Sequence, residues 1–226
     1  MSQSPVPDWR KPIPLFPLQH CVLLPHATIP LHIFEPRYRA MMASVLDSHG
    51  LIAMATFEGD AWMADYQGKP PIRPCVCVGL VVRHEKLPDG RYNLLLQGLA
   101  RARVAREPPH DPYRVAMLEP VEPRTPMEID LDDLRRTLEA LLGDPGLTDH
   151  DGVAAVRNIV SGEIPTAVLI DLAALACMQD NEQRYAMLAE PDAAARGRML
   201  VRWLRHARAA AAGEPTPLWD DEPGLN

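Results

Sequence analysis

Apolar runs interrupted by prolines dominate the front of the chain. Residues 13–42 read IPLFPLQHCVLLPHATIPLHIFEPRYRAMM, in which two strand-like runs lead into the start of a helix. Proline cannot donate a hydrogen bond to a sheet ladder, so these runs are predicted at strand ends, edges or bulges. Pro36 suits the first turn of a helix, because its missing N–H needs no partner there. Apolar residues follow at helical spacing, and Gly50 can serve as the C-cap.

Short strand patterns continue to about residue 118. Residues 51–55 are predicted as a buried strand, followed by a polar loop to Pro74, and 75–82 is a continuous apolar run typical of a strand covered on both faces. A turn signal at 87–90 predicts a hairpin, and Gly98 permits a bulge in its second half. The remaining strands are predicted at 92–96, 101–106 and 113–118. Short strands at this spacing favour a compact β barrel with one inserted helix.

Helical patterns begin after a proline-rich linker at 119–126. A helix is predicted to start at Asp130 or Asp132 and to end near Gly143, because leucines recur there at helical spacing. Asp180 and Asp192 are expected to cap two later helices. Two further helices are predicted at 151–160 and 166–178.

Net charge separates the same two halves. Residues 1–122 carry a net charge of +1 and residues 123–226 a net charge of −8, which together give −7. This distribution argues against a general polyanion-binding protein, which would show a basic footprint. The predicted organisation is a flexible N-terminus at 1–12, a barrel at 13–122, a helical bundle at 123–212 and a disordered acidic tail at 213–226.

Cysteine usage and the apolar runs indicate a cytoplasmic protein. No run reaches the roughly 18 apolar residues of a membrane span, and MSQSPVPDWRKP lacks the apolar region of a signal peptide. The cysteines do not form a disulfide framework. Cys75 and Cys77 could form a zinc site with His20, Cys21 or His84, but the paired ligand spacing is missing. They are interpreted as small buried side chains, and no metal or cofactor is expected.

The opening text resembles the N-terminal, substrate-binding domain of the Lon protease family. Gly79, the hairpin 89–92, Gly98 and Arg101 fall where that domain has its "G…DG…G..R" sequence. The run Asp192…Arg196…Leu200 is similar to its helical extension, so the resemblance covers about residues 13–208. His26-Ala27 departs from it, since the family often has glycine there.

The resemblance implies an α+β fold, with a PUA-like β barrel that carries an inserted helix and is followed by an α-helical bundle. It also implies a set of structural motif residues, which are Pro30, Glu35, Pro36, Arg37, Gly79, Gly90, Gly98 and Arg101. Glu35 and Arg37 are interpreted as residues that fix the helix start, with Arg37 held by a carboxylate or by backbone carbonyls.

The catalytic parts of a full Lon protease are missing from this sequence. A phosphate-binding loop needs G-x-x-x-x-G-K-[ST], whereas Gly68-Lys69 has Met63 at the first glycine position and Pro70 at the hydroxyl position. The Lon dyad needs a lysine after its serine, and none follows Ser161. No catalytic residue is assigned, and a non-enzymatic protein is predicted.

The resemblance therefore implies polypeptide binding, as an adaptor or regulator in protein quality control. Unfolded or extended polypeptide segments are the expected partners, together with a separate Lon-type protease. The expected site is an apolar groove between barrel and bundle, lined by Phe34, Tyr38, Met41 and Met42. For Phe34 a place in the core at the base of the helix, beside Tyr38, also stays open, in which case its truncation to alanine would cost about 3–5 kcal/mol.

Two other functions stay open at this stage. PUA-like barrels often bind RNA, and Arg101, Arg103 and Arg106 alternate along a strand, although the near-neutral barrel counts against RNA binding. An enzyme with unrecognised chemistry is the second. Leu218-Trp219 in the acidic tail is either a docking motif or one stray aromatic in an untethered segment.

Overall fold

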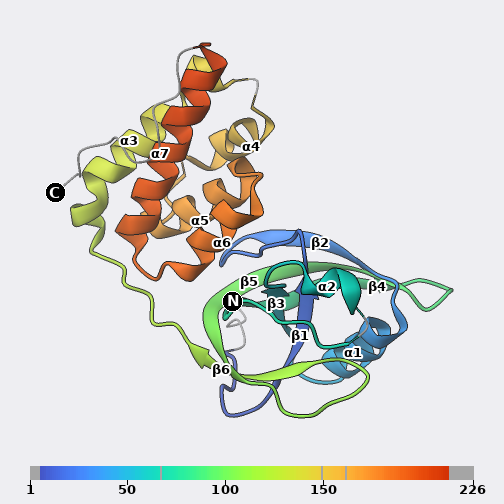
Figure 1. Ribbon diagram of the computed structural model, residues 1–226. Coiled ribbons are helices and arrows are strands. Elements are labelled where there is room, and N and C mark those ends of the chain that lie inside the picture. The colour runs from blue at the N-terminus through green and yellow to red at the C-terminus, as the bar shows by residue number, and fades with distance from the viewer. Residues whose placement is uncertain (1–5, 67, 149, 161, 214–226) are drawn as a thin grey trace. The chain divides into compact units, whose positions relative to one another are not determined.

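The chain folds into two compact units in the computed structural model, which describes residues 6–66, 68–148, 150–160 and 162–213. The barrel unit comprises residues 1–123 and 180–191, and the bundle unit comprises residues 124–179 and 192–226. Figure 1 labels the elements of both units. The change from strands to helices was predicted at 119–126. In the structure the last strand ends at Pro120, and the first helical turn after it begins at Glu128. The prediction assigned 180–191 to the bundle, whereas this segment packs with the barrel unit.

Six strands build the barrel unit. They are β1 (Ile13–Leu18), β2 (Thr28–Ile33), β3 (Leu51–Thr56), β4 (Cys75–Lys86), β5 (Tyr92–Arg106) and β6 (Val115–Pro120). The strand order is β2-β5-β4-β3-β1-β6, and β5 also pairs with β6, so that all strands except β2 form a closed ring. The pairing of β1 with β3 is parallel and the others are antiparallel. The predicted α+β fold with a barrel is confirmed.

The long strand β5 makes the closure possible. It pairs with β2 through its first half and with β6 through its second half, and Figure 1 shows it curving around the barrel. The two strands predicted at 92–96 and 101–106 are therefore one. Leu99 is the extra residue where the register to β4 shifts, which confirms a bulge next to Gly98. A Cβ on Gly98 would lie 2.2 Å from the carbonyl oxygen of Leu24, so only glycine fits this close approach.

Three helices belong to the barrel unit: α1 (Pro36–Leu46), α2 (Ala61–Ala64) and α6 (Asn181–Ala189). α1 starts at Pro36 as predicted, but it ends at Leu46 with Asp47 as its C-cap. Gly50 lies beyond the helix in the left-handed conformation and donates to the carbonyl of Val45. α2 was not predicted; it forms in the loop assigned as polar, where Trp62 stacks on Phe57.

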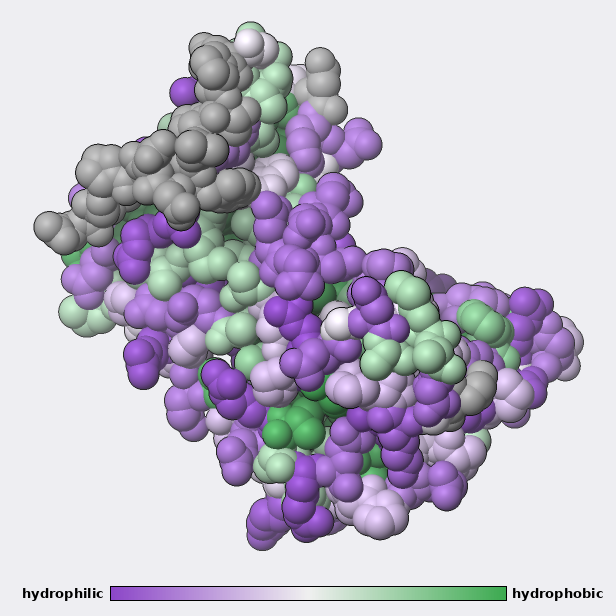
Figure 2. Space-filling view, viewed as in Figure 1, coloured by the Kyte–Doolittle hydropathy of each residue, from purple (hydrophilic) through white to green (hydrophobic). Residues whose placement is uncertain are grey.

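The barrel is filled by small and branched apolar side chains, including Cys75 and Cys77, whose predicted burial is confirmed. One cluster joins Leu15 of β1 and Val78 of β4, with Trp9 packed against it. Trp9 lies in the stretch predicted as a flexible N-terminus, and its contact with this cluster ties that one position to the core. On the face drawn in Figure 2, hydrophilic residues cover much of the surface.

Prolines within strands occupy positions where no ladder bond is lost. The N–H of Leu15 donates to Arg114 on the β6 side of β1, and Pro17 has the same orientation two residues later. The pairing of β1 with β6 involves only Ile13 and Pro14, so the nitrogen of Pro17 faces a side without a ladder. The prediction that these runs avoid central strands is wrong for β1, which pairs with β3 and with β6, and Pro17 fits there because the pairing with β6 has already ended.

His26 occupies a bulge that normally favours glycine. Its N–H donates to the carbonyl of Gly98, whose own N–H donates to the carbonyl of Ala27, and His26 has a φ of 68°. This is the hydrogen-bond pattern of a bulge whose first residue is left-handed, usually a glycine. The departure noted at His26-Ala27 thus leaves the bulge intact, at the expense of an unfavourable backbone conformation.

We expect His26→Gly to be more stable than His26→Ala by about 1 kcal/mol, because glycine adopts the left-handed region without strain. Both variants lose the imidazole, so the difference between them isolates the backbone. Urea unfolding at equilibrium measures it. In the exposed part of α1, Ala40→Gly should show the opposite sign, a loss of about 1 kcal/mol. A His26→Gly variant less stable than His26→Ala would contradict this account.

The bundle unit contains α3 (Asp132–Leu142), α4 (Asp151–Val160), α5 (Thr166–Cys177) and α7 (Ala193–Ala211). Single 3-10 turns at Glu128–Leu131 and Pro145–Leu147 flank α3. The caps predicted at Asp180 and Asp192 are confirmed, since each side chain accepts a backbone N–H of its helix. The predicted tail at 213–226, with Leu218-Trp219, lies outside the described residues except for Gly213.

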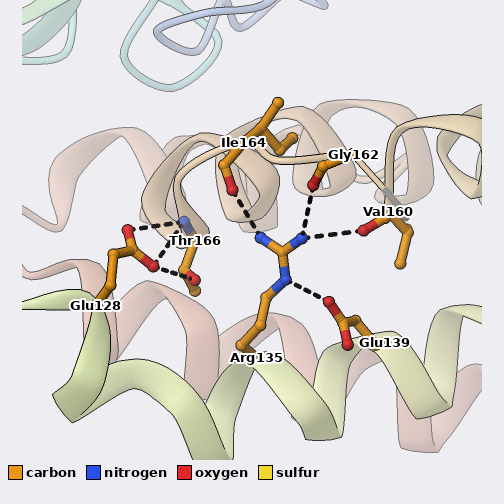
Figure 3. Close-up of polar contacts among 7 residues, drawn as sticks. All are labelled: Glu128, Arg135, Glu139, Val160, Gly162, Ile164 and Thr166. Carbon is orange, nitrogen blue, oxygen red and sulfur yellow. Dashed lines mark hydrogen bonds and ion pairs between the residues drawn. The ribbon is translucent and has the colours of Figure 1, made fainter.

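Two side chains fasten the start of α5 and the end of α4. The guanidinium of Arg135 donates to the carbonyls of Val160, Gly162 and Ile164 and pairs with Glu139 at 2.6 Å (Figure 3). In the same view, the carboxylate of Glu128 accepts the backbone N–H and the hydroxyl of Thr166, at 3.0 and 2.7 Å. These groups satisfy helix termini that would otherwise lack partners, which indicates a structural role.

Candidate functional site

The outward face of β2, β5 and β4 forms a groove on the barrel unit. The strand registers place His32, Asn93 and Glu85 in one row across the sheet, and Pro30, Leu95 and Arg83 in the next. Residues in such rows point to the same face of a sheet. The groove has a volume of about 760 Å³, and it is lined by Pro30, Leu31, His32, Arg83, His84, Glu85, Asn93, Leu94 and Leu95.

Phe34 extends this face beyond the end of β2. Its side chain is 60% exposed, and its ring stacks on that of His32 with 6.2 Å between centroids. The alternative that placed Phe34 in the core beside Tyr38 is therefore wrong. An aromatic ring exposed to this extent, stacked on a histidine that lines the groove, adds an apolar contact surface beside polar groups, which is typical of binding sites.

A hydrogen-bond chain orients His32. Its Nδ1 lies 2.7 Å from the Oδ1 of Asn93, and its Nε2 lies 3.3 Å from a guanidinium nitrogen of Arg91. Arginine can only donate, so Nε2 accepts and Nδ1 carries the proton that it donates to Asn93. The side chain of Asp89 accepts hydrogen bonds from the backbone N–H and the guanidinium of Arg91 and so holds Arg91 in place. The bond from the backbone N–H is the largest cause of the lowered pKa of the Asp89 carboxyl. The ring that supports Phe34 is thereby fixed on both nitrogens.

The other three predicted binding residues lie inside the barrel unit. Tyr38 is 3% exposed, and Met41 and Met42 are fully buried on the inner side of α1. Tyr38 packs edge-on against Phe16 at 4.6 Å, and burial raises the pKa of its phenol. These positions rule them out as surface contacts in this structure. Their helical spacing marks the buried stripe of α1 instead.

Glu35, Pro36 and Arg37 form a structural device at the start of α1. Arg37 pairs with Glu35 at 3.1 Å, donates to the carbonyl of Tyr66, and lies over the rings of Tyr38 and Tyr66. The hydroxyl of Tyr66 closes the cluster by donating to Glu35 at 2.7 Å. Desolvation, and then this carboxylate, raises the pKa of Tyr66. Arg37 is thus held by a carboxylate and a backbone carbonyl, as predicted.

The remaining motif residues also have structural positions. Gly90 has a φ of 82° in the hairpin turn between β4 and β5, a conformation that glycine adopts without strain. A Cβ on Gly79 would lie 2.8 Å from Leu96, so its absence lets the two strands pack. Arg101 is buried, and it donates to the carbonyls of Met187 and Leu188 at the end of α6.

Chemically reactive arrangements are scarce in the part of the chain that the structure describes. Within that part, no group of three histidine, cysteine or carboxylate side chains could hold a metal ion. Burial raises the pKa of the Cys177 thiol to about 12 and that of Cys21 above its ordinary value. Thiolates, the nucleophilic form, are disfavoured there.

A family model describes the same region. The model of the ATP-dependent protease La (LON) substrate-binding domain matches residues 12–206. The chain belongs to this family. The match includes both units, and it makes this chain a member of a domain family for substrate recognition. Among the described helices, none has the length and apolar character required to cross a membrane.

Curated relatives share the family but are much longer. The Lon protease of Desulfosudis oleivorans is 23% identical over 220 residues, which cover 91% of this chain and 26% of that protein. Lon protease 2 of Myxococcus xanthus is 25% identical over 206 residues, with coverages of 89% and 24%. The chain thus spans about a quarter of the length of these relatives.

Solved structures agree with the fold. A Lon N-terminal domain protein from Xanthomonas campestris is 24% identical with a TM-score of 0.58, and the match covers 85% of this chain and 98% of that one. The N-terminal domain of the Mycobacterium avium complex Lon protease is 17% identical with a TM-score of 0.64, covering 86% and 98%. At these identities the likeness establishes the architecture alone.

Sequence reasoning missed most of the groove, although one signal for it was present. Residues 28, 30, 32 and 34 share one parity along an extended segment, and the apolar residues Ile29, Leu31 and Ile33 share the other. This alternation could have assigned Phe34 to the outer face. The contributions of β4 and β5 could not be found in this way, because they depend on the registers between strands.

Proposed function

We propose that the barrel unit binds unfolded or extended polypeptide segments at the outward face of β2, β5 and β4. The observation that carries the proposal is the exposed ring of Phe34, fixed on His32 beside the groove. Apolar surface that is continuous and bordered by polar residues marks interaction sites, and Phe34 extends the apolar surface of the groove. Family membership supports a role in substrate recognition.

The chemistry of the groove favours apolar segments over strongly charged ones. Phe34, Pro30 and Leu95 provide apolar contacts, while Arg83 and Glu85 bring charges of opposite sign to neighbouring rows. Burial of apolar surface is not screened by salt. Binding of a polypeptide should therefore persist at high ionic strength.

The biological setting follows from the same binding activity. A domain that captures exposed apolar segments, and that carries neither of the Lon catalytic motifs in its sequence, suits an adaptor or regulator in protein quality control. It would present such segments to a separate Lon-type protease. Its expected partners are these segments and that protease.

Phe34→Ala tests the proposal. The probe is reduced and carboxymethylated α-lactalbumin, a permanently unfolded chain, compared with the folded form in fluorescence anisotropy. Wild type should prefer the unfolded form, and Phe34→Ala should weaken its binding about tenfold, as expected for an aromatic contact worth about 1–2 kcal/mol. The stability of the variant should change by less than about 1 kcal/mol, because the ring is exposed.

Ile129→Ala is the matched control, since Ile129 is 70% exposed and belongs to the bundle unit. It should bind like wild type. Equal affinity of Phe34→Ala and wild type would refute the site. A single-stranded RNA probe separates the alternative function, because RNA affinity would fall steeply with salt through counterion release. RNA binding that exceeds polypeptide binding at every salt concentration would overturn the proposal.

A further inference from the structure

β2 has a free edge next to the groove. On one side it pairs with β5 over its whole length, from Thr28↔Gln97 to Ile33↔Tyr92. Among the described strands, none pairs with its other side. An unpaired edge presents a row of backbone N–H and C=O groups, which are complementary to another extended chain.

Hydrogen bonds at both ends of β5 determine which residues of β2 face that edge. The carbonyl of Gly98 accepts the N–H of His26 at 2.9 Å, and the N–H of Gly98 donates to the carbonyl of Ala27 at 2.8 Å. Even-numbered residues in this part of β5 therefore direct their backbone N–H and C=O groups toward β2. The N–H of Leu87 donates to the carbonyl of Arg91 in the hairpin at 2.8 Å. Odd-numbered residues of β5 therefore direct their backbone groups toward β4. Bonded and non-bonded pairs alternate along antiparallel strands. The residues of β2 that direct their backbone groups to the free edge are Thr28, Pro30 and His32.

Pro30 therefore lacks its N–H at the free edge and not in the ladder with β5. The edge offers complete donor and acceptor pairs at Thr28 and His32, about 13 Å apart, and the carbonyl of Pro30 between them. All three residues are exposed. Proline at an edge is a known protection against indiscriminate pairing. Here it removes one donor of three and leaves the others available.

We propose that polypeptide segments bind to this protein as an added strand along the free edge of β2. The occupant must be extended, because the groups on offer are backbone donors and acceptors repeating every second residue. Every second side chain of the added strand would lie on the same face as Phe34 and His32. The groove would therefore favour strands whose side chains at these positions are apolar. This inference rests on the proposed function and specifies its mode of recognition.

The test changes the number of backbone donors at the edge. The probe is a fluorescein-labelled ten-residue peptide of alternating valine and threonine with a lysine at each end. Pro30→Val restores an N–H and should tighten binding about 3–10-fold, the value of one net hydrogen bond. Thr28→Pro removes an N–H that β5 does not use and should weaken binding by a similar factor. Thr28→Val keeps the N–H and should bind like wild type.

The outcomes separate strand addition from the proposed function. Peptide and lactalbumin binding that Phe34→Ala weakens, but that Pro30→Val and Thr28→Pro leave unchanged, would refute strand addition and retain the site. Absence of binding of both probes to wild type would refute the proposed function, and the inference with it. If Pro30→Val dimerises in sedimentation without binding peptide more tightly, the edge accepts a second copy and the proposal is wrong. Pro30→Val remains decisive if Thr28→Pro does not fold.

Discussion

Arg196→Ala is expected to destabilise the bundle unit by about 3–5 kcal/mol. Arg196 of α7 and Asp171 of α5 are 2% and 1% exposed, and their Nε and Oδ1 atoms lie 3.0 Å apart. Removing the guanidinium breaks an ion pair whose two side chains are both buried. Breaking a buried ion pair by removing one member costs more than an exposed ion pair contributes. Equilibrium unfolding in urea measures the loss.

Two further variants define the cause. Arg198→Ala removes an exposed arginine from the same helix and should change stability by less than about 0.5 kcal/mol. Replacing both members of the pair, as Asp171→Leu with Arg196→Met, should recover most of the loss, since no buried charge is then left alone. An Arg196→Ala protein within 1 kcal/mol of wild type would show that the pair does not hold α5 to α7.

Arg101→Met is expected to cost about 3 kcal/mol and to loosen α6 selectively. The guanidinium of Arg101 donates to the carbonyls of Leu188 and Met187 at 3.2 and 3.3 Å, where the helix leaves acceptors without intrahelical partners. Hydrogen bonds from a charged donor contribute about 1.5–3 kcal/mol each. Methionine keeps most of the apolar stem, so the variant mainly removes these bonds.

Hydrogen exchange provides the local measurement for this prediction. Amides of α6 should exchange faster in Arg101→Met than in wild type, while amides of β3 in the barrel core should stay protected relative to those of α6. Arg103→Met is the control, because Arg103 is exposed on the same strand; it should leave α6 unchanged. Uniform loss of protection across the barrel unit would show instead that Arg101 supports the whole sheet.

α6 has other attachments that the variant leaves in place. The backbone N–H of Cys75 donates to the hydroxyl of Tyr185 at 2.9 Å, and Arg73 lies 3.4 Å over that ring while it pairs with Glu182. Burial raises the pKa of Tyr185 to about 12, so the hydroxyl stays protonated across the neutral range. α6 should therefore loosen without detaching completely.

The sequence by itself determined the local structure of this protein. Pro36 and the cap residues Asp180 and Asp192 fixed helix starts, because proline geometry and side-chain capping act within three or four residues. Apolar runs and turn signals placed the strands, because they too act over a few residues. The family resemblance then predicted the architecture, which the family model and solved structures confirm.

Only the tertiary structure decided where these elements meet. α6 packs with the barrel unit through contacts between Arg101 and residues 86 and 87 positions later, and no local pattern encodes such a pairing. Phe34 and Tyr38 are both aromatic residues at one helix start, yet Tyr38 turns into the core and Phe34 to the surface. The groove follows from the registers of β2, β5 and β4, because a hydrogen-bonded register fixes which side chains share a face.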